Sequence, residues 1–334
     1  MEFGEGGLEI ARKGPLLTHV IVTERLTKFY GSRCVVNGLN MRVPAGSVYG
    51  FLGRNGAGKS TTIKMLLGVV QPNYGRIELL GHELSALPSE VRGRIAYLAE
   101  GHPVYGWMTV TEAARFFRSF HPGRWNQRLL DQILEHFELP LRTKLRRLSN
   151  GQRASVALAL AVAPDPDLLV LDDPTLGLDT VARRDFLMSL IHLVARKGRT
   201  ILFSSHILAD VERVADRIGI LVDGVLRVDC PTDRFKESVS KIVLEFAGRP
   251  PTFPGCTGLV QAWEVGRRLE LVIVDFGPSQ RQVIESLKPL AWDIVGLNLE
   301  DAFVDYTRGP RRSLPVFGEE PPEDQPKQSD RGAA

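Results

Sequence analysis

Nine consecutive residues in the first part of the chain have the types and the order that suit binding of a phosphate group. The segment Gly53–Thr61 reads GRNGAGKST; it follows the apolar run Val48–Leu52 and precedes Thr62–Leu67, which is predicted to be helical. Glycines let the backbone curl until successive N–H groups point at phosphate oxygens, and the start of a helix adds positive charge. Lys59 would contact the β- and γ-phosphates of a nucleoside triphosphate, and Ser60 would ligate Mg²⁺. The alternative is a flexible glycine-rich turn, which the flanking strand and helix disfavour. The predicted nucleotide-binding residues of this phosphate loop are Gly53, Asn55, Gly56, Ala57, Gly58, Lys59, Ser60 and Thr61.

Two adjacent carboxylates follow another apolar run. Leu168–Leu171 is predicted to be a buried strand, and Asp172 and Asp173 come directly after it. A metal ion with its waters would explain why a buried strand stops at two charges. Asp172 is the expected Mg²⁺ ligand, directly or through water, and Asp173 is placed to act as a general base or to polarise an attacking water. An acidic turn is a common end for a strand, but a phosphate loop in the same chain favours the catalytic interpretation.

A third pattern lies about 20 residues before Asp172. Leu148–Gln152 reads LSNGQ and opens an alanine-rich segment, Arg153–Ala163, which is predicted to be a helix. Ser149 is suited to cap this helix, and the free N–H groups of Gly151 and Gln152 would suit an anion. By itself the pattern also describes a helix with an ordinary cap.

The elements that must position these residues follow from the spacing of apolar side chains. Alternation from Val20 to about Leu80 predicts short strands, and a period of 3.6 residues from Pro88 to Arg147 predicts mainly helices. Leu168–Leu171 and Thr200–Ser204 are strand-like, with a helical stretch from about 181 to 197 between them. This strand–helix–strand order implies a parallel sheet, and the site residues should gather at the carboxyl ends of its strands.

The C-terminal part has a different pattern and predicts a small α+β domain over 235–308. Its predicted strands and helices are 242–246, 259–265, 269–274, 280–287 and a last helix with Leu299, Ala302, Phe303 and Tyr306 on one face. Glycines interrupt any periodicity in residues 1–18, which we expect to be a flexible leader. Residues 309–334 are rich in proline and charge and predict a disordered tail.

Composition limits the classes of function. The 334 residues carry 42 Lys and Arg against 39 Asp and Glu, a net charge of +3 that gives no support for a nucleic-acid partner. The three cysteines are far apart and disfavour both disulfides and a zinc site, which makes the reducing cytoplasm the expected compartment. The longest purely apolar run, Ala157–Ala163, is far shorter than the roughly 18 residues of a membrane span. We therefore expect any membrane association to come through a partner.

The position of Leu148–Gln152 between the phosphate loop and the acidic strand end resembles the signature of the ATP-binding cassette (ABC) ATPases. The resemblance extends from about Val20 to Asp229. It implies an α/β fold with a mixed sheet that carries the phosphate loop, an antiparallel edge subdomain, and a helical subdomain over about 88–160. The nucleotide-binding domain would then cover 19–234.

The resemblance also assigns roles to residues that carry no signal of their own. His206 matches the switch histidine that contacts the γ-phosphate, and Pro174–Asp179 matches the D-loop, which crosses between two cassettes. Tyr30 stands at the place of the aromatic ring that stacks on adenine, although packing in the core explains it nearly as well.

Two positions depart from the family pattern. Glu100 stands where most relatives have the Gln that senses Mg²⁺ and contacts the membrane partner, and a carboxylate can still bind Mg²⁺ or water. Asp173 stands where the family usually has Glu. Because Asp is shorter by one methylene, and a displacement of about 1 Å can cost on the order of a hundredfold in rate, we expect slow hydrolysis unless the backbone shifts to compensate.

In this family two chains pair head to tail, so that each ATP lies between the phosphate loop of one chain and the signature of the other. The resemblance therefore implies that Ser149, Asn150, Gly151 and Gln152 contact the partner's ATP, in a dimer of this chain or with a related cassette. Transport is favoured because the interval from Lys59 to Ser149 is about 90 residues, the size of a plain helical subdomain.

The ending Asn298–Tyr306 resembles that of single-cassette subunits of bacterial exporters whose permease is a separate chain. The segment Glu100–Thr109, with Tyr105, Trp107 and Met108, would receive a short permease helix, or Trp107 would be part of the core. We expect a Mg²⁺-dependent ATP hydrolase bound to a permease at the inner face of the cell membrane.

In single-cassette exporter subunits the additional C-terminal domain assists dimer contacts or regulation. In this chain the domain could also be a passive cap. The alternative function is a regulatory or assembly module that dimerises on ATP and hydrolyses it very slowly.

Overall fold

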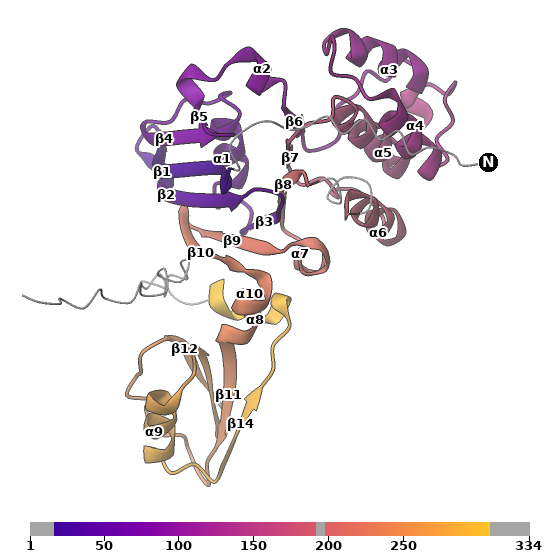
Figure 1. Ribbon diagram of the computed structural model, residues 1–334. Helices are drawn as coiled ribbons and strands as arrows, with labels where there is room; N and C mark the ends of the chain where they lie inside the picture. The colour runs from indigo at the N-terminus through magenta and orange to yellow at the C-terminus, as the bar shows by residue number, and fades with distance from the viewer. Residues whose placement is uncertain (1–16, 192–197, 308–334) are drawn as a thin grey trace, which may run out of the picture.

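Alternating apolar residues near the N-terminus form a four-stranded antiparallel sheet. The computed structural model describes residues 17–191 and 198–307, and Figure 1 labels its elements. The strand order is β2-β1-β4-β5, formed by β1 (His19–Tyr30), β2 (Arg33–Pro44), β4 (Tyr74–Leu79) and β5 (His82–Glu83). Ile21, Leu26 and Met41 are fully buried on one face of this sheet. The prediction of strands in this part of the chain is confirmed.

The phosphate loop follows the third strand of the chain, which belongs to a six-stranded sheet. The strand order is β10-β9-β3-β8-β7-β6, formed by β3 (Val48–Leu52), β6 (Ile95–Leu98), β7 (Leu168–Leu171), β8 (Thr200–Ser205), β9 (Arg217–Val222) and β10 (Val225–Pro231). All neighbours in this sheet are parallel except β9 and β10. The carboxyl ends of β3, β6, β7 and β8 therefore meet at one edge, as predicted for the site residues.

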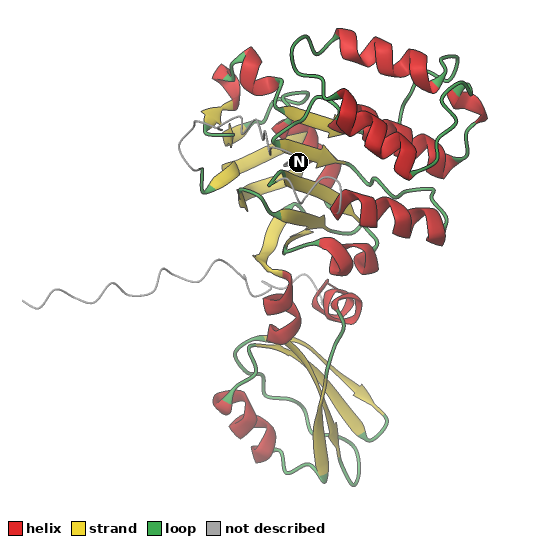
Figure 2. Ribbon diagram, turned by 45° about the vertical axis from the view of Figure 1, so that its right-hand side comes forward, coloured by secondary structure: helices red, strands yellow, loops and turns green. Residues whose placement is uncertain are grey.

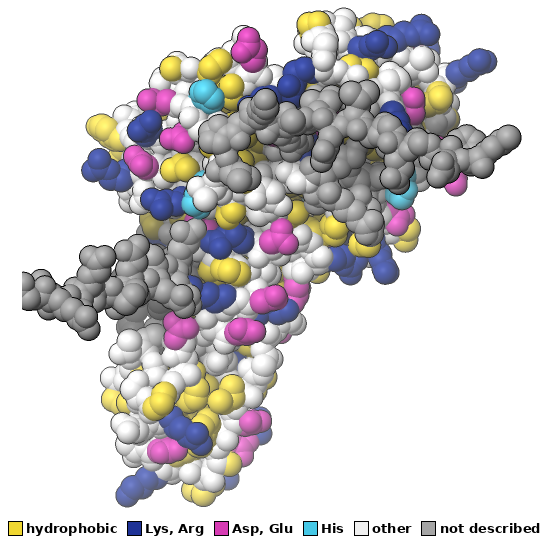
Figure 3. Space-filling model, in the orientation of Figure 1, with side chains coloured by type: hydrophobic (Ala, Val, Ile, Leu, Met, Phe, Trp, Pro, Cys, Tyr) yellow, Lys and Arg dark blue, Asp and Glu magenta, His cyan; other side chains and the backbone are white. Residues whose placement is uncertain are grey.

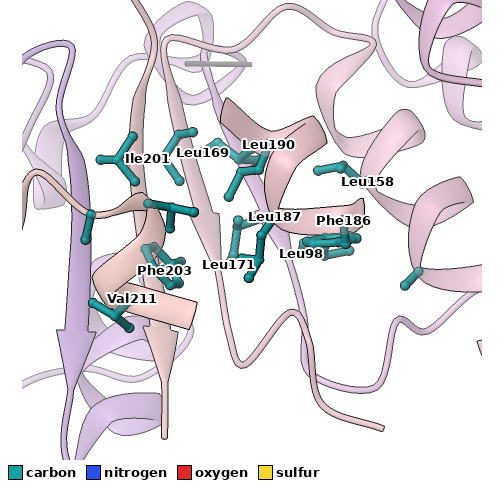
Figure 4. Packing of buried hydrophobic residues seen from close by; sticks show 14 of the residues in the cluster. Leu98, Leu158, Leu169, Leu171, Phe186, Leu187, Leu190, Ile201, Phe203 and Val211 are labelled. Atoms are coloured by element: carbon teal, nitrogen blue, oxygen red, sulfur yellow. The ribbon is translucent and has the colours of Figure 1, made fainter. Parts of the chain in front are cut away.

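Both faces of this sheet are covered. Along β3, Tyr49 and Phe51 pack with α1 (Lys59–Leu66) and the antiparallel sheet, whereas Val48 and Leu52 belong to the cluster on the opposite face. That second face is covered by α6 (Thr180–Ser189) and α7 (Leu208–Val214). Figure 4 shows Phe186, Leu187 and Leu190 pointing at the leucines of β6 and β7. Burial of strands on two faces fixes the positions of the loops that leave them.

The segment between β6 and β7 is a group of helices, seen at the upper right of Figure 1. These are α3 (Val110–Ser119), α4 (Gln127–His136) and α5 (Asn150–Val162), and α2 (Ser89–Arg92) precedes β6. The periodicity predicted mainly helices over 88–147, and Ile95–Leu98 is an exception that it did not reveal, because these residues form strand β6 of the central sheet. Four residues are too few to show a helical or a strand period, so the pattern of the surrounding helices hid this strand.

The C-terminal part forms a separate four-stranded antiparallel sheet with the order β12-β13-β11-β14. Its elements are α8 (Thr232–Ser238), β11 (Val239–Glu245), β12 (Leu259–Val265), β13 (Arg268–Val274), α9 (Pro278–Ser286), β14 (Ala291–Val295) and α10 (Leu299–Thr307). Helix α9 packs on one face of this sheet, and α10 returns to the main body (Figures 1 and 2). There Tyr306 of α10 meets Phe235 of α8 edge to face at 5.7 Å. The sequence did not predict β14 or α8.

Some predictions fall on residues that the structure does not describe. These are most of the leader, 1–16, the end of the helix expected after residue 180, 192–197, and the whole predicted tail, 309–334. Within 17–191 and 198–307, none of the helices has the length and apolarity needed to span a bilayer.

Candidate functional site

The phosphate loop connects the buried strand β3 to helix α1. Gly58 is the N-cap of α1 with φ +110°, and a Cβ there would lie 2.7 Å from the carbonyl oxygen of Val35. Gly56 also has a positive φ, +83°. A residue with a side chain would be strained at both positions, so the glycines predicted from the sequence are required by the backbone itself. The result is a helix N-terminus whose first N–H groups face open space.

The ammonium group of Lys59 lies under this loop. Its side chain is only 5% exposed, and Nζ donates a hydrogen bond of 2.8 Å to the carbonyl oxygen of Gly53. Burial lowers the pKa of Lys59, and the carboxylates of Asp173, Asp172 and Glu100 act in the opposite direction. Three nearby carboxylates thus keep a buried cation in place, where an anionic ligand would add to its stabilisation.

The two aspartates after β7 are held by serine hydroxyls from neighbouring elements. Ser204 of β8, fully buried, donates to Asp172 Oδ1 at 2.8 Å and accepts from the backbone N–H of Asp173 at 2.9 Å. Ser60 of α1 donates to the same oxygen of Asp172 at 3.3 Å. Asp172 itself is 2% exposed. These contacts join the predicted Mg²⁺ ligands Ser60 and Asp172, which come from segments far apart in the sequence.

Asp173 occupies a different position from its neighbour. Its backbone is left-handed, with φ +43°, and its carbonyl oxygen accepts a hydrogen bond of 3.1 Å from the N–H of Leu176. The carboxylate turns toward His206, whose Nδ1 lies 2.9 Å from Asp173 Oδ1. The structure therefore brings the predicted catalytic pair together at the ends of β7 and β8.

These groups surround one cavity of about 550 Å³. Its volume lies within the usual range of small-molecule sites, roughly 300–1,000 Å³. The cavity is lined by Tyr30, Arg33, Val35, Asn55, Gly56, Gly58, Lys59, Ser60, Thr61, Glu100, Asp173, Leu176 and His206. Of the residues predicted to bind the nucleotide and metal within one chain, Gly53, Ala57 and Asp172 do not line it.

Tyr30 and Glu100 complete the site at its borders. The ring of Tyr30 is 51% exposed, so packing in the core does not explain it, and Lys28 Nζ lies 5.3 Å from its centroid. An exposed flat ring beside a phosphate loop is available for stacking. Glu100 follows the end of β6 and lines the same cavity.

The oxygen donors at this edge of the sheet fit a magnesium ion. Mg²⁺ takes one or two carboxylates and hydroxyls from a protein and completes its shell with water and phosphate. The Ser60 hydroxyl and the Asp172 carboxylate are already in contact, and Glu100 lines the same cavity. Among the described residues no group of three or more His, Cys, Asp or Glu is arranged to hold a metal ion.

The residues of the LSNGQ pattern lie outside this cavity. Ser149 caps α5 in a capping box, in which its Oγ accepts from the N–H of Gln152 and Gln152 Oε1 accepts from the N–H of Ser149, both at 3.1 Å. Asn150 is exposed and its amide lies 3.4 Å from the carbonyl oxygen of Gly177. Asp179 caps α6 and accepts two backbone N–H bonds. All three are surface residues with local capping or loop contacts, and the cavity of the same chain does not include them.

A sequence profile of the ABC transporter family matches residues 36–176. The bacitracin transport ATP-binding protein BcrA of Bacillus licheniformis is 38% identical over 233 residues, which cover 69% of this chain and 75% of BcrA. The chain belongs to the ABC transporter family. The Nod factor export ATP-binding protein I of Paraburkholderia xenovorans (strain LB400) is 31% identical over 292 residues, 85% of this chain and 95% of that protein.

The fold of this ABC cassette agrees with the sequence relationship. A solved structure of the ATP-binding subunit of an ABC transporter has a TM-score of 0.59 and 30% identity, and covers 65% of this chain and 92% of that one. The predicted resemblance to ABC ATPases and the predicted α/β cassette fold are therefore confirmed.

Sequence reasoning did not identify several residues of the cassette site. Ser204 was read only as part of a strand, yet it contacts both aspartates, and Arg33 and Val35 line the cavity without belonging to a motif. One signal was available for Ser204. Its hydroxyl stands at the carboxyl end of a buried strand, next to the strand that ends at Asp172 and Asp173. Arg33 and Val35 carry no comparable signal.

The position of Ser204 yields a stability prediction. We expect Ser204→Ala to lower the free energy of unfolding of the nucleotide-free chain by roughly 2 kcal/mol, because the buried Asp172 loses a donor and the Asp173 N–H loses an acceptor. Urea denaturation would measure this. The matched control is Ser205→Ala, whose hydroxyl bonds only locally at Ile207, and which should cost roughly 1 kcal/mol. Equal effects of the two substitutions would contradict the proposed bridge.

Proposed function

We propose that this chain hydrolyses ATP and drives a membrane transporter, with export as the direction. The single observation that carries the proposal is the convergence of Lys59, Ser60, Asp173 and His206 on one cavity at the start of α1. A phosphate loop supplies anion donors, and the carboxylate and imidazole supply the groups that hydrolysis requires.

Each group has a distinct part in the reaction. Lys59 and the loop N–H groups hold the β- and γ-phosphates, while Asp173 accepts a proton from the attacking water and His206 orients the γ-phosphate. The water oxygen forms a bond to the γ-phosphorus while the bond between the γ-phosphorus and the β–γ bridging oxygen breaks. The products that leave are ADP and phosphate. Mg²⁺, held by Ser60 with Asp172 and Glu100, would supply neutralising charge on the β- and γ-oxygens.

Two chains would be needed for one complete site. Ser149–Gln152 lies outside the cavity of its own chain, and the N–H groups of Gly151 and Gln152 stand at the start of the long helix α5. A second cassette, arranged head to tail, would place these donors against ATP bound to the first. ATP would then stabilise the closed pair, and loss of phosphate would open it.

The surface beside Glu100 supports a permease as the partner. An aromatic patch, made of Tyr105, Trp107, Phe116 and Phe120, has Trp107 65% and Phe120 63% exposed. Trp107 is therefore not a core residue. Figure 3 shows Lys and Arg side chains gathered with hydrophobic ones over the α3 end of the molecule. Exposed aromatic rings are typical anchors of protein interfaces, and this patch follows the Glu100 loop directly.

The names of the relatives support transport and favour export. BcrA is named for bacitracin transport and the Paraburkholderia protein for Nod factor export. The second candidate, an ATP-dependent regulatory or assembly module, is favoured by the short carboxylate of Asp173. We also propose that the C-terminal domain, 235–308, assists dimer contacts or regulation, with the cassette covering 19–234. The cassette would work at the inner face of the membrane through the permease.

The role of Lys59 can be tested by binding alone. We expect Lys59→Ala to weaken ATP binding on the order of a hundredfold, because the phosphates lose a buried cation. Isothermal titration with MgATP would measure this. Lys64→Ala, on the exposed side of the same helix, is the control and should bind like the parent protein. Unchanged affinity in Lys59→Ala would mean that the loop does not hold ATP in the proposed way.

The length of the Asp173 side chain yields a prediction about rate. We expect Asp173→Glu to raise the turnover number for MgATP on the order of tenfold, since the added methylene brings the carboxylate closer to the attacking water. Phosphate release at saturating ATP would measure the gain, and ATP affinity should stay within about twofold. A fast parent protein with no gain in the variant would show that the shorter residue is not limiting.

Transport and regulation predict different partners. We expect purification of the chain from its native membranes to retain a polytopic permease, and Trp107→Ala to reduce the permease recovered by about tenfold through loss of an exposed anchor. Tyr74→Ala, at an exposed aromatic residue 68% accessible on β4, is the control and should retain the permease. Recovery of soluble partners only would favour the regulatory module.

A further inference from the structure

Two loops that face the cavity leave neighbouring parallel strands and are joined at their bases. Strands β6 and β7 pair in parallel, and the N–H of Asp172 donates to the carbonyl oxygen of Leu98 at 2.9 Å. Beyond this point the segment Ala99–Pro103, here called the sensing loop, turns outward and carries Glu100 to the cavity. The loop after β7 carries Asp173 to the same cavity.

His102 ties the two loops together a second time. Its side chain is buried, with 5% exposure, and its Nε2 lies 2.6 Å from the carbonyl oxygen of Pro174. A carbonyl oxygen only accepts, so Nε2 carries the proton of this bond. The backbone of His102 is left-handed, with φ +52°, a conformation that costs free energy in a residue with a side chain. The fold thus maintains an unfavourable backbone conformation at the residue whose imidazole is buried beside Pro174.

The bonded carbonyl belongs to the residue directly after Asp173. Asp173 is itself left-handed, and its N–H and carbonyl oxygen are held by Ser204 and Leu176. Bonding of the Pro174 carbonyl fixes the next peptide, Pro174–Thr175, and so restrains the backbone on the C-terminal side of Asp173. Pro174 is buried, so loss of the His102 donor would leave the Pro174 carbonyl oxygen unpaired or would allow the Pro174–Thr175 peptide to rotate.

The next residue extends this connection to the switch histidine. Thr175 Oγ1 donates to Asp210 Oδ2 at 2.8 Å, and both side chains are buried. Asp210 lies on α7, four residues after His206. The sensing loop, the Asp173 segment and the base of α7 are in this way joined behind the cavity by two buried hydrogen bonds, neither of which contacts the cavity itself.

We propose that His102 is a positioning residue for hydrolysis, which holds the Pro174 carbonyl so that the Asp173 carboxylate stays beside His206. The same bond makes the place of Asp173 depend on the conformation of the sensing loop. This inference rests on the role proposed above for Asp173. Since His102 touches neither the cavity nor the phosphate loop, its effect falls on the rate of hydrolysis and not on ATP binding.

The experiment compares two substitutions that fill the same space. His102→Met removes the donor, whereas His102→Gln places an amide N–H at the reach of Nε2. Single-turnover hydrolysis of MgATP by the full chain, with ATP affinity measured separately, gives the rate and the binding. We expect His102→Met to lower the hydrolysis rate on the order of tenfold with affinity unchanged within about twofold, and His102→Gln to recover most of the rate.

A matched control separates this role from general packing. His136 Nε2 lies 2.8 Å from Ser189 Oγ, between α4 and α6, away from both loops. His136→Leu should leave the hydrolysis rate unchanged. If His102→Met is too unstable to assay, His102→Asn replaces it, because its shorter amide does not reach Pro174, and the same loss of rate is expected.

Three results would overturn the inference. These are a parent-like rate in His102→Met or His102→Asn, an equal loss in His102→Gln, and a loss of rate explained by weaker ATP binding. Failure of the proposed function would give a different result, because the parent chain itself would then neither bind nor hydrolyse MgATP.

Discussion

The ammonium group of Lys59 is buried within reach of three carboxylates, and the remainder of the site depends on keeping this charge balance. A buried cation is costly unless it is paired, and Asp172, Asp173 and Glu100 each act to keep it charged. The carboxylates in turn need donors, which Ser60, Ser204 and His206 supply. A triphosphate brings four negative charges into this balance. Its binding would therefore change the charge balance around Lys59.

This concentration of charge is possible because the sheet beneath it is apolar on both faces. Leu169 and Leu171 face α6, while Leu168 and Val170 face the other cluster, so β7 cannot move without opening the core. The antiparallel sheet and α1 cover one side, and the helices after β7 and β8 cover the other. The rigid strands fix the positions of the loops at one edge of the sheet. The site residues are those that follow the last buried residue of each strand.

The sequence could predict whatever was encoded locally. The phosphate loop, the Leu168–Leu171 strand and the capped helix at Ser149 each combine a turn signal with an apolar run, and all three lie where they were expected. Strand β6 could not be predicted, because its pairing with β7 is a long-range contact and four residues carry no period. The contacts of Ser204 and His102 were hidden for the same reason, since their partners lie 32 and 72 residues away. His206 and Tyr30 were found through family resemblance alone.

The short carboxylate of Asp173 makes the backbone around it more important. A glutamate has three side-chain torsions with which to adjust to water and phosphate, whereas an aspartate has two, so its carboxylate depends more closely on the position of its backbone. Here that peptide is left-handed and held on both sides, by Ser204 and Leu176 directly and by His102 through Pro174. We therefore expect a shift of the sensing loop to displace the carboxylate, because the two side-chain torsions of an aspartate leave little freedom to compensate. In the proposed mechanism the sensing loop would therefore act on the rate of hydrolysis in two ways, through the Mg²⁺ contact of Glu100 and through the position that His102 gives to Asp173.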